Sequence, residues 1–189
     1  MVDVRRVPEA DFAAVYDLLC ERVGDRDRET VRSWFDATPE LFQGAYDDGD
    51  GLVGFALGRE RSETSAELAG IGVERAYTRR GIGSRLLAAF EDAAADAGYG
   101  RVSLGSAGGY VDEFYLANGY EPESILVRKS RDESLDEYRE ADFAVLRERV
   151  HAGVRKLYVA PGGYDPERVD AVRDAFDDPD ALYVMEKYL

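Results

Sequence analysis

The sequence predicts an α/β fold with a mixed β-sheet, and two observations support this class. Residues 47–51 are a cluster of turn-forming residues between two strand-like runs, 41–46 and 52–57, and this pattern is typical of a hairpin. Further along the chain, strand-like and helix-like segments alternate, which is typical of strands joined by helices. The first strands should therefore be antiparallel neighbours, and the later strands should be connected through helices.

Local signals justify the elements in order. Pro8 can start a helix without losing a hydrogen bond, and Gly24 ends the apolar helical pattern that follows it. Gly98 ends a second apolar stripe in the same way. A capping box opens at Ser134, and Asp165 with its following proline starts the final helix. The expected strands cover 2–6, 41–46, 52–57, 67–73, 101–104, 120–128, 154–160 and 181–188. The first expected helix follows Pro8, includes Cys20 and stops at Gly24, and the other expected helices cover 30–35, 82–97, 111–117, 134–150 and 166–176.

Composition limits the classes of function. With 189 residues, of which 45% are hydrophobic and 33% charged, the chain has a globular balance and is long enough for one compact domain. Its formal charge of −15 argues against nucleic-acid binding, because the phosphate backbone would be repelled. The acid either attracts a cationic amine substrate or forms the salt-adapted surface of a halophilic-type protein. Its spread along the whole chain favours the second interpretation.

The sequence carries no targeting or metal-binding signal. No apolar run approaches the roughly 20 residues that span a bilayer, and the N-terminal residues lack the apolar core of a signal peptide. We therefore expect a soluble cytoplasmic protein that does not associate with membranes. Cys20 is the only cysteine and His151 the only histidine, so we expect no disulfide and no metal site. We interpret Cys20 as a small packing residue and His151 as a helix-terminal or exposed residue.

The most informative segment is the turn at 79–84, between a predicted strand and a predicted helix. A helix start leaves backbone N–H groups without partners, and the helix dipole adds positive potential there. The two glycines of the turn let an anion approach the backbone, and its two arginines can add charge-assisted hydrogen bonds. A third glycine for a dinucleotide fingerprint is missing at Leu86, and no P-loop is present. The residues expected to hold a diphosphate are Arg79, Arg80, Gly81, Ile82, Gly83 and Ser84.

The same segment, Thr78-Arg-Arg-Gly-Ile-Gly83, resembles the cofactor motif of the GNAT superfamily of N-acetyltransferases, written Arg/Gln-x-x-Gly-x-Gly/Ala. Both glycines match, and threonine stands at the leading position. Three further matches follow the family's order: the opening at 4–11, the third strand at 52–55, and Phe114-Tyr-Leu-Ala-Asn-Gly-Tyr-Glu121, which is similar to Phe-Tyr-x-x-x-Gly-Phe. Gly108 stands where the family often has asparagine. The resemblance covers about residues 1–130.

This resemblance implies a sheet that is splayed at its centre and flanked by helices. The pantetheine arm of acetyl-CoA would lie between the fourth and fifth strands, with its diphosphate on the 79–84 turn. Backbone groups of Ile71, Gly72 and Val73 would hydrogen-bond the pantetheine and polarise the thioester carbonyl. The implied activity is transfer of an acetyl group from acetyl-CoA to a primary amine, by direct attack in a ternary complex without a metal.

Two side chains are candidates for proton transfer. An amine near neutral pH is mostly protonated, so a base must remove a proton before attack. Glu67 matches the general-base glutamate of the family's histone acetyltransferases, although a solvated glutamate at a strand end fits equally well. Glu74 and the acidic insertion at 131–180 offer other candidate bases. Tyr115 matches the family tyrosine that often protonates the departing thiolate, and packing beside Phe114 is its alternative role.

The C-terminal third extends the family's pattern. We expect one domain over 1–189, with a core of about 1–130 plus a last strand at 181–189. Residues 131–180 would then be an insertion of helix and strand before that last strand. The insertion either shapes the amine pocket, or it is an added layer that covers a sheet edge or makes a homodimer contact.

The sequence leaves the acceptor and one alternative function open. A small-molecule amine and a protein N-terminus are both compatible with the motifs, which hold the coenzyme and not the acceptor. Because Thr78 and Gly108 depart from the family's pattern, a non-catalytic module that binds or senses acyl-CoA is the alternative to an enzyme.

Overall fold

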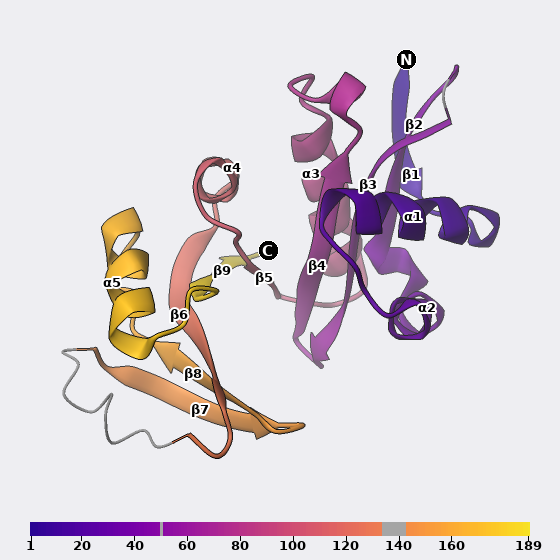
Figure 1. Ribbon diagram of the computed structural model, residues 1–189. Helices are drawn as coiled ribbons and strands as arrows, with labels where there is room; N and C mark the ends of the chain where they lie inside the picture. Colours follow the sequence, from indigo (N-terminus) through magenta and orange to yellow (C-terminus); the bar gives the residue numbers. More distant parts are fainter. Residues whose placement is uncertain (50, 134–142) are drawn as a thin grey trace. The chain divides into compact units, whose positions relative to one another are not determined.

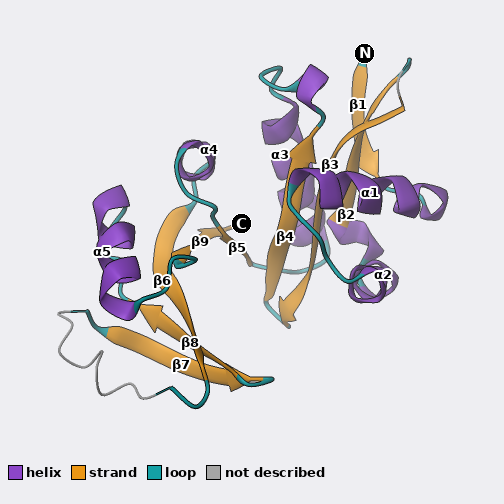
Figure 2. Cartoon of the chain, in the orientation of Figure 1, coloured by secondary structure: helices purple, strands orange, loops and turns teal. Residues whose placement is uncertain are grey.

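The computed structural model describes residues 1–49, 51–133 and 143–189 (Figure 1). It divides into two compact units. The first unit comprises residues 1–103 together with 188–189, and the second comprises residues 104–187. Each unit has its own helices and strands, as Figure 2 shows, and each is described by itself.

The first unit is a sheet in the order β1-β2-β3-β4-β5. Its first four strands are antiparallel neighbours, and β4 pairs in parallel with the start of β5. The sheet is therefore mixed, which confirms the predicted fold class. The elements are β1 (Val2–Arg6), α1 (Phe12–Arg22), α2 (Arg28–Ala37), β2 (Phe42–Asp47), β3 (Gly51–Ser62), β4 (Ser65–Val73), α3 (Ile82–Asp96) and β5 (Arg101–Gly105), with single turns of 3-10 helix at Glu9–Asp11, Pro39–Leu41 and Arg75–Tyr77.

Helices cover both faces of this sheet. Gly58 and Leu57 are consecutive in β3, so their side-chain positions face opposite ways. Leu57 belongs to a core that contains α1 and α2, whereas a Cβ on Gly58 would meet Phe90 of α3. The face toward α1 and α2 buries residues from these two helices and from two strands: Phe12, Val15, Leu18, Leu19, Val31, Phe35, Phe42, Phe55 and Leu57.

The second unit continues from β5 in the strand order β5-β9-β6-β8-β7. Strand β6 pairs antiparallel with both β9 and β8, and β8 pairs antiparallel with β7. Asp165 caps α5 by accepting a hydrogen bond from the Glu167 amide at 3.0 Å, as its sequence signal predicts. The elements are α4 (Tyr110–Ala117), β6 (Glu121–Ser130), β7 (Val145–His151), β8 (Val154–Val159), α5 (Pro166–Phe176) and β9 (Leu182–Tyr188).

One predicted element is wrong in part. The helix expected over 134–150 starts among residues 134–142, which lie outside the described residues, but its second half is strand β7. Pairing with β8 outweighs the local capping signal, because six residue pairs align Val145–His151 with that strand. His151 is consequently an exposed residue at a hairpin and not at a helix end. The single-domain reading of 1–189 stays a prediction.

Candidate active site

The turn after β4 is anchored at both sides. The Thr78 hydroxyl donates to the Arg75 carbonyl at 3.0 Å, and the Tyr77 hydroxyl donates to Asp47 at the end of β2 at 3.0 Å. Gly81 has φ +74° and precedes the first residue of α3. A Cβ there would meet open space, so glycine is required for its left-handed conformation and not for room. These contacts hold the predicted anion-binding turn in place.

The N-terminus of α3 is uncapped. No side chain accepts a hydrogen bond from its first amides, and its first turn contains no acidic residue. This is unusual for a chain with 39 acidic residues, since helix starts normally attract both capping side chains and acid. The cap and first turn of α3 therefore contribute no side chain that would offset its first amides or the positive end of the helix dipole.

Two arginines flank this helix start. Arg80 lies 4.9 Å over the ring of Tyr77 and donates to the Ala76 carbonyl at 2.8 Å, so its guanidinium is fixed near the turn. Arg79 is exposed and has φ +58°, a conformation that few residues other than glycine adopt. The turn thus combines oriented amides with two cationic side chains, as the sequence predicts for a diphosphate site.

Within the first unit, the pairing of β4 with β5 ends at Glu67. Pairing with β5 covers Ser65–Glu67 against Arg101–Ser103, and within the described residues it stops there. The Glu74 amide donates to Val53 of β3 at 2.9 Å. Because backbone amides alternate in direction along a strand, those of Ile71 and Val73 point away from β3, toward the opposite edge of β4. The Gly72 amide points toward β3 instead.

A β-bulge interrupts β4 between these amides and Glu67. Leu57 opposes Gly70 and Gly58 opposes Leu68, so Ala69 has no partner on β3. A bulge leaves its extra residue outside the ladder and bends the strand locally. Bulges are frequent beside active sites, because they redirect backbone and side-chain groups.

Glu67 lies in an ion-pair cluster. Its carboxylate is paired with Arg59 at 3.1 Å and with Arg61 at 3.2 Å, and its side chain is 23% exposed. Arg59 stands directly opposite Glu67 in the β3–β4 register, so the two share one face of the sheet. That face is the one toward α2, since Arg59 also lies 4.8 Å over the ring of Trp34. The two ion pairs hold the carboxylate of Glu67 in place.

Tyr115 belongs to the second unit and sits on α4. It is 5% exposed and packs edge-on against Phe114 and Tyr120, with ring centroids 5.2 and 5.6 Å away. Burial raises the pKa of its phenol. Its hydroxyl makes no hydrogen bond to any residue in the described ranges. Tyr115 is therefore a protonated phenol with its donor uncommitted.

The structure places the predicted site residues in both units, and it adds neighbours that the sequence did not predict. Glu67, the strand residues 71–73 and the turn at 79–84 all lie in the first unit, whereas Tyr115 lies in the second. Arg59 and Arg61 were not expected at the site. The sequence pattern that could have predicted them is a pair of arginines at alternate positions of one strand, separated by a short turn from Glu67 on the next strand.

The second unit holds another buried polar group near α4. Asp112 is 4% exposed and accepts a short hydrogen bond from the hydroxyl of Ser106. Burial, and then the neighbouring carboxylate of Asp112, raise the pKa of the Tyr164 phenol. Gly108, at the position where related motifs often have asparagine, has φ +90° in the loop between Ser106 and α4. No sequence pattern pointed to this group.

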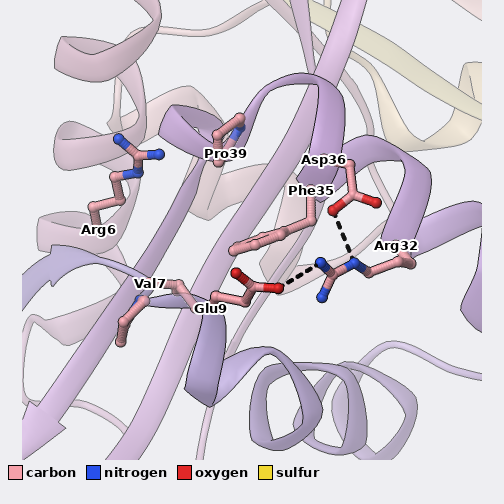
Figure 3. Close-up of a pocket in the computed structure, with 8 residues that line it drawn as sticks. Arg6, Val7, Glu9, Arg32, Phe35, Asp36 and Pro39 are labelled. Atoms are coloured by element: carbon pink, nitrogen blue, oxygen red, sulfur yellow. Dashed lines mark hydrogen bonds and ion pairs between the residues drawn. The ribbon is translucent and has the colours of Figure 1, made fainter.

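A hollow of about 410 Å³ opens elsewhere in the first unit (Figure 3). Phe35 and Pro39 form part of its wall, and Arg32 bridges Glu9 at 2.9 Å and Asp36 at 2.8 Å along another side. Neither Glu67 nor any residue of the 79–84 turn lines it. It is therefore separate from the candidate site.

The described residues lack two features, one that concerns membranes and one that concerns metal ions. No helix there is long and apolar enough to cross a membrane. In the same ranges, no three histidine, cysteine, aspartate or glutamate side chains are grouped to hold a metal ion.

Comparisons with known proteins give one family match and several similar folds. The model of the acetyltransferase (GNAT) family matches residues 12–120. A search of curated proteins found no match. Similar solved structures include Naa50 of Arabidopsis thaliana in complex with the bisubstrate analogue CoA-Ac-MVNAL (18% identity over 100% of this chain and 99% of that one, TM-score 0.63).

Two archaeal structures are also similar. One is Ard1 from Thermoplasma volcanium (19% identity, 100% of this chain and 97% of that one, TM-score 0.54). The other is the PaiA N-acetyltransferase of Thermoplasma acidophilum in complex with coenzyme A (17% identity, 100% and 99%, TM-score 0.55). At these identities the likeness establishes the fold.

Proposed function

Because the chain belongs to the acetyltransferase (GNAT) family, we propose that it moves an acetyl group from acetyl-CoA to a primary amine, by direct attack in a ternary complex. Membership makes the chain an acyltransferase enzyme with acetyl-CoA as its cosubstrate. The observation that carries the proposal is the N-terminus of α3, which has neither a capping side chain nor an acid in its first turn. Such a helix start is suited to an anionic ligand.

The cosubstrate would be held by backbone more than by side chains. Its diphosphate would accept hydrogen bonds from the amides at 81–84, while Arg79 and Arg80 add positive charge. Gly81 gives the turn its left-handed conformation, and neither Gly81 nor Gly83 carries a side chain that would shield these amides. The pantetheine arm would run along the edge of β4 toward which the Ile71 and Val73 amides are directed.

A charge placed at the helix start tests this assignment. Ser84→Glu puts a carboxylate in the first turn of α3, where it suits the helix dipole but repels a diphosphate. We expect the Kd for coenzyme A to rise about tenfold or more, since about 1.4 kcal/mol of repulsion has that effect, while the melting temperature is kept. Isothermal titration calorimetry measures the Kd.

The matched control is Ala95→Glu, the same charge on an exposed position of the same helix. It lies about 16 Å along the axis from Ser84, which is beyond the screening length at physiological salt. Equal Kd values for the two variants would contradict a diphosphate site at the helix start.

Chemistry at the thioester requires a donor, a base and an acid. Attack by the amine puts negative charge on the carbonyl oxygen, and a fixed amide of Ile71 or Val73 would stabilise that charge. Glu67 would accept the proton that the attacking amine loses, directly or through water. Tyr115 would donate its phenolic proton to the departing thiolate, and the raised pKa of that phenol keeps the proton available.

Glu67→Gln tests the base. The amide keeps the shape of the side chain but cannot take a proton, so we expect kcat to fall by about 10²-fold or more while the Kd for coenzyme A is unchanged. Release of thiol in the presence of acetyl-CoA and an amine panel gives the rate. Unchanged kcat with a confirmed acceptor would remove Glu67 from the mechanism, and Glu74→Gln would then be measured in the same way.

The class of acceptor is proposed as a small-molecule amine or a protein N-terminus. The Naa50 structure contains an analogue that joins CoA to the peptide MVNAL, which supports peptide N-termini as one option for this fold. A protein that binds acetyl-CoA but releases thiol with no amine would be a sensory module and not an enzyme. Cytoplasmic location, homodimer formation and the role of residues 131–180 stay predictions.

A further inference from the structure

Two arginines surround the candidate base. Arg59 donates from one nitrogen to both oxygens of Glu67, at 3.2 and 3.1 Å, and Arg61 donates from one nitrogen at 3.2 Å. Both arginines come from β3, and we refer to them as the β3 arginine pair. With the carboxylate they form a cluster whose net charge is +1.

The β3 arginine pair has hydrogen-bonding capacity to spare. A guanidinium carries five N–H donors in a planar fork, and each arginine uses one nitrogen on Glu67. The side chains of Arg59 and Arg61 are 42% and 26% exposed, so the remaining donors can be reached by a ligand. The ring of Trp34 beneath Arg59 restricts where that guanidinium lies.

The net charge of this cluster is opposite in sign to that of the whole chain. The chain carries −15 overall, and a carboxylate with a single arginine would already be neutral. The second arginine therefore leaves a positive charge beside the candidate base. A positive charge there is unfavourable for a cationic amine, unless the acceptor brings a negative group of its own.

We propose that the acceptor is an amine that also bears a carboxylate, which the β3 arginine pair binds while Glu67 receives the proton of the amine. This inference rests on the proposed function, because it needs the acceptor to reach Glu67. A free amino acid and a peptide with an acidic residue next to its N-terminus share this chemistry. Arginine forks match carboxylates by paired hydrogen bonds, so the pair would set specificity through binding.

The alternative role of the two arginines is to hold Glu67 in place. A positioning role would lower kcat with every acceptor alike when either arginine is removed. A specificity role would raise KM for acceptors that carry a carboxylate and leave KM for the others unchanged. The two roles are therefore separated by acceptor pairs that differ in one charge.

The test uses two acceptor pairs, glutamate with its α-amide and a tetrapeptide with Glu or Gln at its second position. Thiol release is measured for the unaltered enzyme and for Arg59→Ala, Arg61→Ala, Arg59→Lys and Arg61→Lys. We expect the unaltered enzyme to prefer the more acidic member of at least one pair by tenfold or more in kcat/KM. The alanine variants should abolish this preference through KM, and the lysine variants should retain part of it.

Controls keep the outcomes distinct. Arg5→Ala removes an exposed arginine of β1 and should leave the preference intact. Calorimetry with coenzyme A and a thermal melt identify any variant that has lost its fold, and the lysine variants then supply the comparison. Release of thiol with no preference between pair members overturns the inference alone. A protein that binds acetyl-CoA but acetylates none of the four acceptors, nor any other amine, overturns the proposed function as well.

Discussion

Gly58→Ala is expected to destabilise the first unit by about 3 kcal/mol, which is a large effect for one methyl group. The added Cβ would lie 2.6 Å from the Phe90 ring of α3 and still closer to the carbonyl oxygen of Glu67. The ring cannot retreat easily, because Phe90 is completely buried. The β4 backbone cannot move away either without breaking its pairing with β3 on both sides of the bulge.

Thermal denaturation measures this effect. For a chain of this length, about 3 kcal/mol corresponds to a fall in melting temperature of roughly 6–12 °C. Gly100→Ala is the matched control, because a Cβ at Gly100 meets no atom within 4 Å and its φ is ordinary. That control should change the free energy of unfolding by less than about 0.5 kcal/mol. A Gly58→Ala protein as stable as the control would show that β3 and α3 are packed less closely than described.

Tyr115→Phe is expected to lower kcat by about 10²-fold while leaving the fold and the Kd for coenzyme A nearly unchanged. Phenylalanine keeps the ring that packs against Phe114 and Tyr120. It removes a hydroxyl that has no partner in the described part of the chain, so its loss should cost less than about 1 kcal/mol. Rate and stability therefore separate the acid role from the packing role.

Tyr99→Phe is the control, since it removes the hydroxyl of another buried tyrosine, one that donates to Glu60 at 3.1 Å. Its kcat should match that of the unaltered enzyme. Equal rates for Tyr115→Phe and Tyr99→Phe would exclude Tyr115 as the acid. Steady-state thiol release and a thermal melt on both variants provide the two readouts.

The pH dependence from Tyr115 has a definite sign. Burial raises its pKa in the folded protein above the ordinary value of 10.0. The neutral phenol therefore stays available as an acid through neutral and mildly alkaline pH. The same shift means that its contribution to stability is complete below pH 10 and is lost as the pH rises from there toward the folded-state pKa.

Elements with strong local signals could be predicted from the sequence. Proline at the start and glycine at the end bracket α1, and the apolar stripe of α3 ends before Gly98, so local and tertiary preferences agree there. The 79–84 turn was recognisable for the same reason, since its glycines and arginines are contiguous. Patterns made by residues that are adjacent in the chain are the ones that a single sequence shows most clearly.

Features that depend on the register between strands could not be predicted from the sequence. The capping box at Ser134 favoured helix over residues that pair with β8, and only that pairing reveals a strand. The residues next to Ala69 in the sequence do not predict the bulge. It is defined by which residues of β3 pair with β4 on either side of Ala69. The β3 arginine pair was not predicted for the same reason, although Glu67 itself was predicted as a candidate base.

The side of β4 past Glu67, where the first unit provides no further pairing with β5, bears on how the protein behaves without cosubstrate. A run of backbone groups without a ladder is a template on which another polypeptide can add. A pantetheine arm lying there would occupy the same amides, so cosubstrate and a foreign strand would compete for one edge. Self-association by strand addition would then begin from the empty enzyme, and storage with coenzyme A would suppress it.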